Sequence, residues 1–182
     1  MRIIAGEWRG RPISAPPGET TRPTADRTRE TMFNMLASRL GTFEGLSVAD
    51  LFAGSGALGL EALSRGAAHC LFVEHDAAAV KAIRANIDKF GSPRMTTVQQ
   101  GSVMSLGPAK VPHDLLLLDP PYDTGAGNVA LDRLVRLGWI GPATWIALET
   151  RAGEDVAVKT LAIEAQRKVG KALISLMTLK GE

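Results

Sequence analysis

Apolar and polar positions follow two distinct patterns along most of this chain. Short runs of apolar and β-branched residues predict strands over 46–52, 69–74, 95–100, 114–119 and 144–150. Between these runs, apolar residues spaced three or four apart predict a helix over 57–66, a helix that Asp76 caps and Gly91 ends, and a helix over 127–138. Strands that alternate with helices are typical of a three-layer α/β sandwich around a mainly parallel sheet, which is the fold we expect.

The start of the chain departs from this alternation. Residues 2–5 and 11–14 flank a turn at 8–10, and this arrangement predicts a small β-hairpin. A proline-rich stretch then precedes a predicted helix over 25–40, for which Thr24 is the expected N-cap. The N-terminal segment therefore reads as an extension that is added to the α/β domain.

The end of the chain departs from the alternation as well. Two strand-like segments on either side of Gly170 predict an antiparallel hairpin, which argues against a pure nucleotide-dehydrogenase type of sheet. We therefore expect a β-hairpin arm and linker over 1–20 and one α/β domain over 21–182.

Composition limits the class of protein. The chain has 182 residues, 45% of them hydrophobic and 22% charged, which suits a single globular domain with a full core. The single cysteine, Cys70, rules out an internal disulfide and fits a reducing cytoplasm. No apolar run approaches the ~20 residues that a membrane helix needs. These features predict a soluble, cytoplasmic protein, and Cys70 is expected to be buried without a catalytic role.

Charge alone does not identify a partner, because the net charge is only +2. Its distribution is less even: residues 1–29 contain six arginines and three acidic residues. An excess of arginine can neutralise phosphates and bind them through two hydrogen bonds. A solvated basic surface explains the same excess equally well.

A glycine-rich loop follows the first predicted strand of the domain. Gly54, Gly56 and Gly59 have G-x-G-x-x-G spacing, and Glu74 ends the next predicted strand 20 residues after Gly54. Glycines permit a sharp turn and close approach of a ligand to the backbone, while a carboxylate at the tip of the next strand can accept both ribose hydroxyls. The strand–loop–helix context therefore predicts a site for a nucleoside cofactor.

Asp50 helps to distinguish between two such cofactors. A carboxylate at the end of the strand, before the loop, can attract the ammonium group of S-adenosylmethionine, whereas it would repel the pyrophosphate of NAD. The alternative is that Asp50 only accepts hydrogen bonds from the amides of the loop.

The fourth predicted strand ends in Asp119-Pro120-Pro121-Tyr122. Two prolines fix the backbone and remove two donors, so this corner can present the Asp119 carboxylate and the Pro120 carbonyl as paired acceptors. Such a pair suits an exocyclic amino group, which donates two hydrogens. Tyr122 could stack on the base, as aromatic residues do where a base leaves its stack. The alternative is a proline-stiffened loop in which the aspartate only caps a helix.

Together these motifs resemble the RsmD family, the bacterial guanine-N2 methyltransferases of small-subunit ribosomal RNA. The resemblance covers nearly the whole chain, through RIIAGEWRGRPI at its start, RPTADRTRETMFNML over 22–36, DLFAGSGALGLEALSRGA over 50–67, VEHD over 73–76 and LDPPY over 118–122. It implies a Rossmann-like, class I methyltransferase fold with seven strands, S-adenosylmethionine as cofactor, and an N-terminal β-hairpin that meets RNA. It also implies a 16S ribosomal RNA substrate, which an assembling small ribosomal subunit would present to a monomeric enzyme.

One segment departs from the pattern of related methyltransferases. Many of them have an aspartate after the third strand that binds the adenine amino group, whereas this chain has Ser102 and Val103 there. Serine is a weaker acceptor, so either its side chain or the Val103 amide would contact the adenine. The segment over 22–36 is expected to lie over the cofactor, with Arg22, Thr24 and Arg27 near the methionine end or the RNA backbone, or else to be a solvated surface helix.

The candidate residues fall into three groups. For cofactor binding they are Asp50, Phe52, Gly54, Gly56, Glu74, His75, Ser102 and Val103; for catalysis they are Asp119, Pro120 and Tyr122; for substrate binding they are Arg9, Arg11, Arg22, Arg27 and Pro121. No metal site is expected, because the three histidines lack ligand spacing. Two other functions remain open: a DNA adenine-N6 methyltransferase, and an NAD-dependent oxidoreductase or nucleotide-binding regulator.

Overall fold

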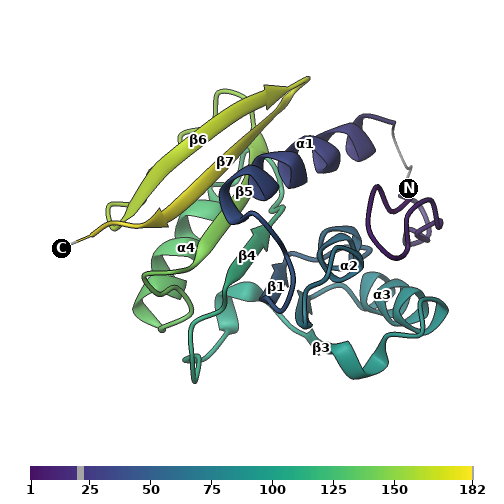
Figure 1. Ribbon diagram of the computed structural model, residues 1–182. Helices are drawn as coiled ribbons and strands as arrows, with labels where there is room; N and C mark the ends of the chain where they lie inside the picture. Colours follow the sequence, from purple (N-terminus) through teal and green to yellow (C-terminus); the bar gives the residue numbers. More distant parts are fainter. Residues whose placement is uncertain (20–22, 182) are drawn as a thin grey trace.

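The computed structural model describes residues 1–19 and 23–181, apart from the side chains of residues 23 and 24. Its centre is a seven-stranded sheet with the order β3-β2-β1-β4-β5-β7-β6 (Figure 1). The first five strands are parallel and are β1 (Ser47–Leu51), β2 (His69–Glu74), β3 (Thr96–Gln100), β4 (Leu115–Leu118) and β5 (Trp145–Arg151). The last two, β6 (Leu161–Val169) and β7 (Ala172–Leu179), form the antiparallel hairpin that the sequence predicts.

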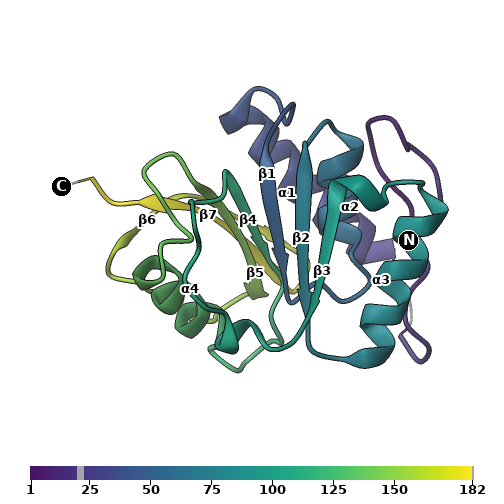
Figure 2. The same cartoon turned by 90° about the horizontal axis from the view of Figure 1, so that it is seen from below.

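Helices cover both faces of the sheet, as Figure 2 shows. One face packs against α1 (Pro23–Leu40), α2 (Ala57–Ser64) and α3 (Ala77–Lys89), and the other against α4 (Ala126–Arg136). Two short 3-10 helices, η1 (Pro93–Met95) and η2 (Val103–Ser105), flank β3. In β4, Leu115 and Leu117 enter the first core, whereas Leu116 and Leu118 enter the second. This double burial confirms the three-layer fold and explains why β4 is continuously apolar.

The predicted element boundaries are nearly correct. Asp76 caps α3 as expected, and its side chain accepts a hydrogen bond from the Ala79 amide at 2.9 Å. The expectation that Thr24 is the N-cap of the first helix is wrong, because α1 already begins at Pro23. Proline suits the first turn of a helix, where its missing donor has no intrahelical partner.

The N-terminal arm pairs with itself as the predicted hairpin requires, but it is short. Three backbone hydrogen bonds join its two segments around one antiparallel bridge, between Arg2 and Pro12, and neither segment is a strand of the sheet. Ile3, Trp8 and Ile13 are buried instead, and the Trp8 ring stacks on Phe90 of the α3 C-cap at 5.0 Å between centroids. The arm is therefore a packed part of the domain surface.

A buried carboxylate, Glu61 of α2, joins the arm to two helices. Its oxygens accept hydrogen bonds from the Ile4 amide at 2.8 Å and the Ala5 amide at 3.1 Å. They also pair with the guanidinium groups of Arg29 on α1 at 3.4 Å and Arg65 at 2.9 Å. Arg29 in turn donates to the Arg2 carbonyl. Because Glu61 and Arg29 are almost fully buried, both need charged partners: Arg29 and Arg65 compensate the Glu61 carboxylate, and Glu61 and Asp26 compensate the Arg29 guanidinium.

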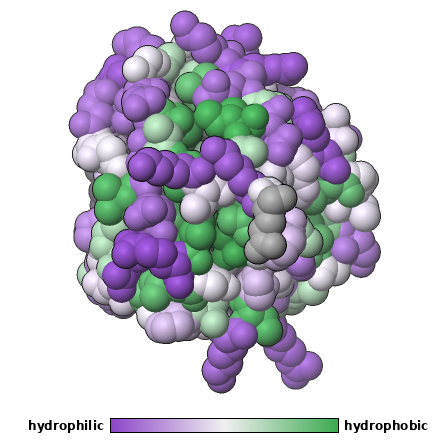
Figure 3. Space-filling model, turned by 90° about the vertical axis from the view of Figure 1, so that its left-hand side faces the viewer, coloured by the Kyte–Doolittle hydropathy of each residue, from purple (hydrophilic) through white to green (hydrophobic). Residues whose placement is uncertain are grey.

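Hydrophobic side chains on the surface are scattered among hydrophilic ones (Figure 3). Within the described residues, no helix is both long enough and apolar enough to span a bilayer. The face drawn in Figure 3 is a mosaic in which hydrophilic side chains separate the hydrophobic patches. The large apolar side chains that are exposed, Val111, Val129 and Ile163, belong to three different segments.

We predict that Glu61→Gln lowers the free energy of unfolding by about 3–5 kcal/mol, because it removes the buried carboxylate that pairs with Arg29 and Arg65 and leaves only the partly exposed Asp26 beside Arg29. Urea unfolding followed by circular dichroism measures this change. Asp132→Asn is the matched control, since Asp132 forms an exposed ion pair with Arg136 on α4 and should contribute less than about 1 kcal/mol. Equal midpoints for the two variants would show that Glu61 does not connect these elements energetically.

Candidate active site

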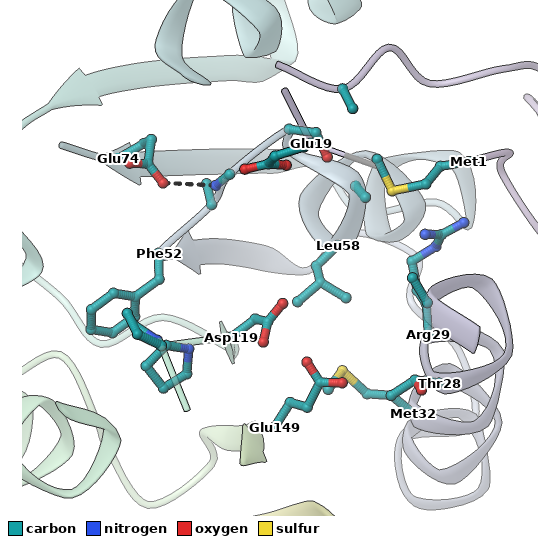
Figure 4. Close-up of a pocket in the computed structure, with 18 of the residues that line it drawn as sticks. Met1, Glu19, Thr28, Arg29, Met32, Phe52, Leu58, Glu74, Asp119 and Glu149 are labelled. Carbon is teal, nitrogen blue, oxygen red and sulfur yellow. Dashed lines mark hydrogen bonds between the residues drawn. The ribbon is translucent and has the colours of Figure 1, made fainter. Parts of the chain in front are cut away.

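A cavity of about 500 Å³ opens at the edge of the sheet where the parallel strands end. Its walls come from the arm, α1, the loop after β1, the end of β2, and the segments that end β4 and β5 (Figure 4). The lining residues with polar or aromatic side chains are Glu19, Thr28, Arg29, Phe52, Ser55, Glu74, His75, Asp119 and Glu149. The cavity lies where ligands bind in open α/β sheets.

The glycines of the loop after β1 have different structural roles. Gly54 lines the cavity with a φ of 58°, and no atom lies within 4 Å of where a Cβ would stand. A Cβ on Gly59, by contrast, would lie 2.4 Å from the Phe72 ring of β2. Gly54 therefore leaves space for a ligand against the backbone, and Gly59 allows α2 to pack closely on the sheet.

Phe52 lines the same cavity in an unusual backbone conformation. Its φ is 61°, a left-handed value that few residues other than glycine adopt. Strain of this kind is found where surrounding structure enforces it, often at ligand sites. Gly56 has a φ of 84° and is the N-cap residue of α2. It does not line the cavity, so its role in this structure is to allow the turn between β1 and α2.

Glu74 lies at the tip of β2 as expected, and its mostly buried side chain lines the cavity. One carboxylate oxygen accepts a hydrogen bond from the Gly54 amide at 2.9 Å, and the other from the Asp76 amide at 2.8 Å. Figure 4 shows the bond to the loop. Each carboxylate oxygen has a second lone pair, so Glu74 can still accept from a ligand hydroxyl. The neighbouring His75 also lines the cavity, with an exposed ring.

Three other candidates for cofactor binding lie outside this lining. Asp50 is buried beneath the loop, where one oxygen accepts from the Gly59 amide at 2.8 Å and the other has no partner. Burial, and secondarily the charge of Glu74, raise the pKa of Asp50 to about 8 despite the bond from Gly59. This bond is the alternative that the sequence left open, and a direct contact between Asp50 and an ammonium group stays a prediction.

Ser102 and Val103 follow β3, as the sequence indicates. The Ser102 hydroxyl caps η2 and accepts a hydrogen bond from the Met104 amide at 3.1 Å. The Val103 side chain is buried in the core beneath α4. Neither residue lines the cavity, so a contact with an adenine base also remains a prediction.

The proline corner after β4 lies on the floor of the cavity. Asp119, Pro120 and Pro121 all line it, whereas Tyr122 does not. The Tyr122 ring is half-buried and lies under the Arg151 guanidinium, 5.3 Å from the ring centroid. A stacking contact between Tyr122 and a base therefore stays a prediction, and in this structure a cation occupies one face of the ring.

A second carboxylate, from Glu149 of β5, lies beside that of Asp119 in the cavity (Figure 4). The strands β4 and β5 are paired so that Leu118 lies opposite Leu148, which places the next residues of both strands side by side. Glu149 is close enough to raise the pKa of Asp119. Sequence reasoning missed Glu149, although its place at the end of a predicted parallel strand was a usable signal.

The environment of Asp119 favours its protonated form. The Asp119 side chain is exposed to the cavity, but the surrounding walls limit its contact with water, and this desolvation is the largest cause that raises the pKa of Asp119 well above its usual range. The neighbouring Glu149 raises it further, and Asp50 and Glu19 add smaller contributions. Desolvation and Glu149 also raise the pKa of Tyr122.

Helix α1 forms one wall of the cavity through Ala25, Thr28, Arg29 and Met32. The segment over 22–36 was expected to lie over the cofactor, and part of it does line this cavity. The residues that line it are not the ones that the sequence analysis selected. Arg27 is exposed and outside the lining, and Arg22 lies outside the described residues. The helical spacing of positions 25, 28, 29 and 32 is the signal that could have identified this face.

The arginines of the arm differ in their contacts. Arg9 is exposed at the turn. Arg11 donates a hydrogen bond to the Lys89 carbonyl at 2.7 Å and lies 4.5 Å from the centroid of the Phe90 ring. Arg11 thus helps to attach the arm to α3, while Arg9 is the more accessible of the two for a phosphate.

Comparison with known proteins places this chain among methyltransferases. The profile of a protein family described as "Conserved hypothetical protein 95" matches residues 1–178. The ribosomal RNA small subunit methyltransferase D of Escherichia coli strain K12 is 37% identical over 150 residues, which are 82% of this chain and 74% of that protein.

Solved structures support the same placement. The putative methyltransferase yhhF from Escherichia coli superimposes with a TM-score of 0.86 and 33% identity over 100% of this chain and 99% of its own. An RNA methyltransferase from Salinibacter ruber, solved in complex with S-adenosyl-L-homocysteine, has a TM-score of 0.65 and 17% identity over 90% and 95% of the two chains. The fold is that of the class I, Rossmann-like methyltransferases, with a C-terminal antiparallel hairpin.

Proposed function

The chain belongs to the RsmD family of ribosomal RNA small subunit methyltransferases, and from this premise we propose that it methylates the exocyclic N2 of a guanine in 16S ribosomal RNA. The observation that carries the proposal is one cavity lined by the Glu74 carboxylate and by the Asp119-Pro120 corner. A cofactor and a base that share this cavity would meet between these groups.

The cavity suits S-adenosylmethionine. Its volume of about 500 Å³ falls within the ~300–1,000 Å³ usual for small-molecule sites. The open space over Gly54 admits a ligand against the backbone, and the free lone pairs of Glu74 can accept ribose hydroxyl hydrogens. When bound, the cofactor supplies a methyl group that a sulfonium centre already activates, so no metal is needed for the transfer.

The acceptors of the proline corner would orient the amino group. The Asp119 carboxylate and the Pro120 carbonyl accept the two N2 hydrogens, which aims the nitrogen lone pair at the methyl carbon. N2 would donate its lone pair to the methyl carbon, whose bond to the sulfonium sulfur would break with both electrons going to sulfur, so positive charge would develop on N2. Asp119 stabilises that charge and accepts the proton that N2 must lose. The reactive form of Asp119 is therefore the carboxylate.

The substrate is proposed to be a nucleotide outside a stacked helix, within a small ribosomal subunit during assembly. A base in a stacked helix does not expose its amino group to an enclosed pocket. Arg9 and Arg27 are exposed and can neutralise phosphates beside the target. Pro121, on the cavity floor, can contact the base itself. The family names support ribosomal RNA more strongly than DNA adenine or a nicotinamide substrate.

For cofactor binding, we predict that Glu74→Ala weakens affinity for S-adenosylhomocysteine by about tenfold or more, because charge-assisted hydrogen bonds to the ribose are lost. Isothermal titration calorimetry measures the affinity, and thermal melting reports whether the loop bonds of Glu74 also support stability. Asp132→Ala on α4 is a matched control that should bind normally. Unchanged affinity in Glu74→Ala, or equal stabilisation of the chain by NAD, would contradict the cofactor assignment.

For catalysis, we predict that Asp119→Ala slows methyl transfer by about 10²–10³-fold or more, because the acceptor that stabilises the transition state is lost. Asp119→Asn should be slowed less, since it retains an acceptor oxygen without the charge. Single-turnover transfer of radiolabelled methyl groups to unmethylated small ribosomal subunits isolates the chemical step. Both variants should bind S-adenosylhomocysteine normally. Transfer by Asp119→Ala at the wild-type rate would mean that another group orients the amino group.

The identity of the product tests the proposal as a whole. Small subunits from a bacterial strain without the family methyltransferase, treated with this protein and S-adenosylmethionine, should gain N2-methylguanosine in 16S RNA. Nuclease digestion and mass spectrometry of the nucleosides identify the product. N6-methyladenosine, or methylation of DNA in preference to RNA, would overturn the assignment.

A further inference from the structure

The Glu149 carboxylate can accept hydrogen bonds inside the cavity, but it has no role in the proposed transfer reaction. The side chain reaches into the cavity from β5 and lies beside Asp119, which follows β4 (Figure 4). Tyr122 is another neighbour, and Glu149 contributes to its raised pKa. Glu149 therefore lies beside the point where the amino group would be methylated.

The Watson–Crick edges of the purines differ at the position next to the amino group. Guanine has an N–H at N1 beside its N2 amino group, so three hydrogens lie in a row. Adenine has a bare N1 with a lone pair beside its N6 amino group. A carboxylate next to the methylated nitrogen therefore accepts a hydrogen from guanine, but it opposes a lone pair on adenine.

We propose that Glu149 is the residue that selects guanine, because its carboxylate accepts the N1 hydrogen while Asp119 and the Pro120 carbonyl accept the hydrogens of N2. This inference rests on the proposed function and assigns the choice of base within the same site. In this arrangement the Asp119 carboxylate binds an N2 hydrogen and the neighbouring Glu149 carboxylate binds the N1 hydrogen. Three acceptors from two neighbouring strands then match three donors of one base.

This arrangement also accounts for the proximity of two acidic groups. The carboxyl groups of Asp119 and Glu149 lie side by side at the ends of β4 and β5, and Glu149 raises the pKa of Asp119. A guanine edge against them places N–H donors on both side chains, which favours the charged form of Asp119. Burying an adenine there would leave a carboxylate facing a lone pair, and unpaired buried acceptors are a strong means of rejection.

Other charged groups surround Asp119 and contribute to its titration. Asp50 of β1 and Glu19 of the N-terminal segment add negative charge. Arg29 of α1, with Glu74 and His75 at β2, lines the same cavity. Of the neighbours that raise the pKa of Asp119, Glu149 has the largest effect. Replacement of Glu149 by glutamine should therefore lower the pKa of Asp119.

The experiment compares guanine with 2-aminopurine, which retains the amino group but has a bare N1 and no O6. Small subunits are reconstituted from ligated 16S RNA that carries either base at the mapped methylation position, and single-turnover transfer is measured. Wild-type protein should prefer guanine by roughly 10²-fold or more. In Glu149→Gln, the side-chain amide can donate an N–H to the bare N1 of 2-aminopurine. The ratio of the guanine rate to the 2-aminopurine rate should therefore decrease by about tenfold or more. The missing O6 affects both proteins equally and cancels in the ratio of preferences.

The pH profile supplies a readout that a purely structural role would not change. The wild-type rate should fall as the pH decreases through the raised pKa of Asp119, because protonation removes the acceptor. In Glu149→Gln this decrease should occur at lower pH. Glu164→Gln is the matched control, since that exposed carboxylate on β6 lies outside the cavity, and both its base preference and its pH profile should equal those of the wild type.

The outcomes separate the two proposals. If the wild-type protein forms no N2-methylguanosine, the proposed function is wrong. If it does, but Glu149→Gln and Glu149→Ala both retain the full guanine preference, only the role of Glu149 is wrong. If thermal melting shows that Glu149→Gln does not fold, Glu149→Ala is measured in its place. We expect Glu149→Ala to methylate guanine more slowly and to prefer guanine over 2-aminopurine less strongly than the wild type does.

Discussion

The parallel register of β2, β1, β4 and β5 determines where the cavity's strand-end groups lie, which include the two acidic groups beside the proposed methylation point. Because these strands run in one direction, the residues that follow them meet at one edge of the sheet. Gly54 follows β1, Glu74 ends β2, Asp119 follows β4, and Glu149 lies near the end of β5. Groups that are up to 95 residues apart in sequence thereby form a single site. A shift of one residue in any strand would turn its functional side chain to the opposite face.

The edge of the sheet alone does not enclose a cavity, and α1 with the arm forms the remaining walls. Their position depends on the buried Glu61, which accepts hydrogen bonds from the arm and pairs with Arg29 of α1. Arg29 lines the cavity as well, so the same residue connects the stability of the fold with the shape of the site. Enclosure matters for the proposed chemistry because electrostatic interactions with a transition state are stronger where water is excluded.

Much of the sheet could be predicted from the sequence because its strands are short apolar runs between helices with clear periodicity. The loop glycines, Glu74 and Asp119 could be predicted because each directly follows or ends such a run. Glu149 and the cavity face of α1 were missed, since their roles depend on which strands are neighbours and on how a helix is rotated. The arm was predicted as a hairpin, and its two segments do pair through three backbone hydrogen bonds, whereas its attachment to α2 through Glu61 and Ser64 could not be predicted because it depends on the tertiary fold.

The central claim is that the ends of β4 and β5 together bind the donor edge of a guanine. A crystal structure of the protein with S-adenosylhomocysteine and an RNA fragment that contains the target nucleotide tests it most directly. The account predicts guanine N2 within hydrogen-bond distance, about 2.7–3.2 Å, of both the Asp119 carboxylate and the Pro120 carbonyl, with N1 at the same distance from Glu149. A base whose amino group points away from this corner, or a base other than guanine in the cavity, would contradict the account.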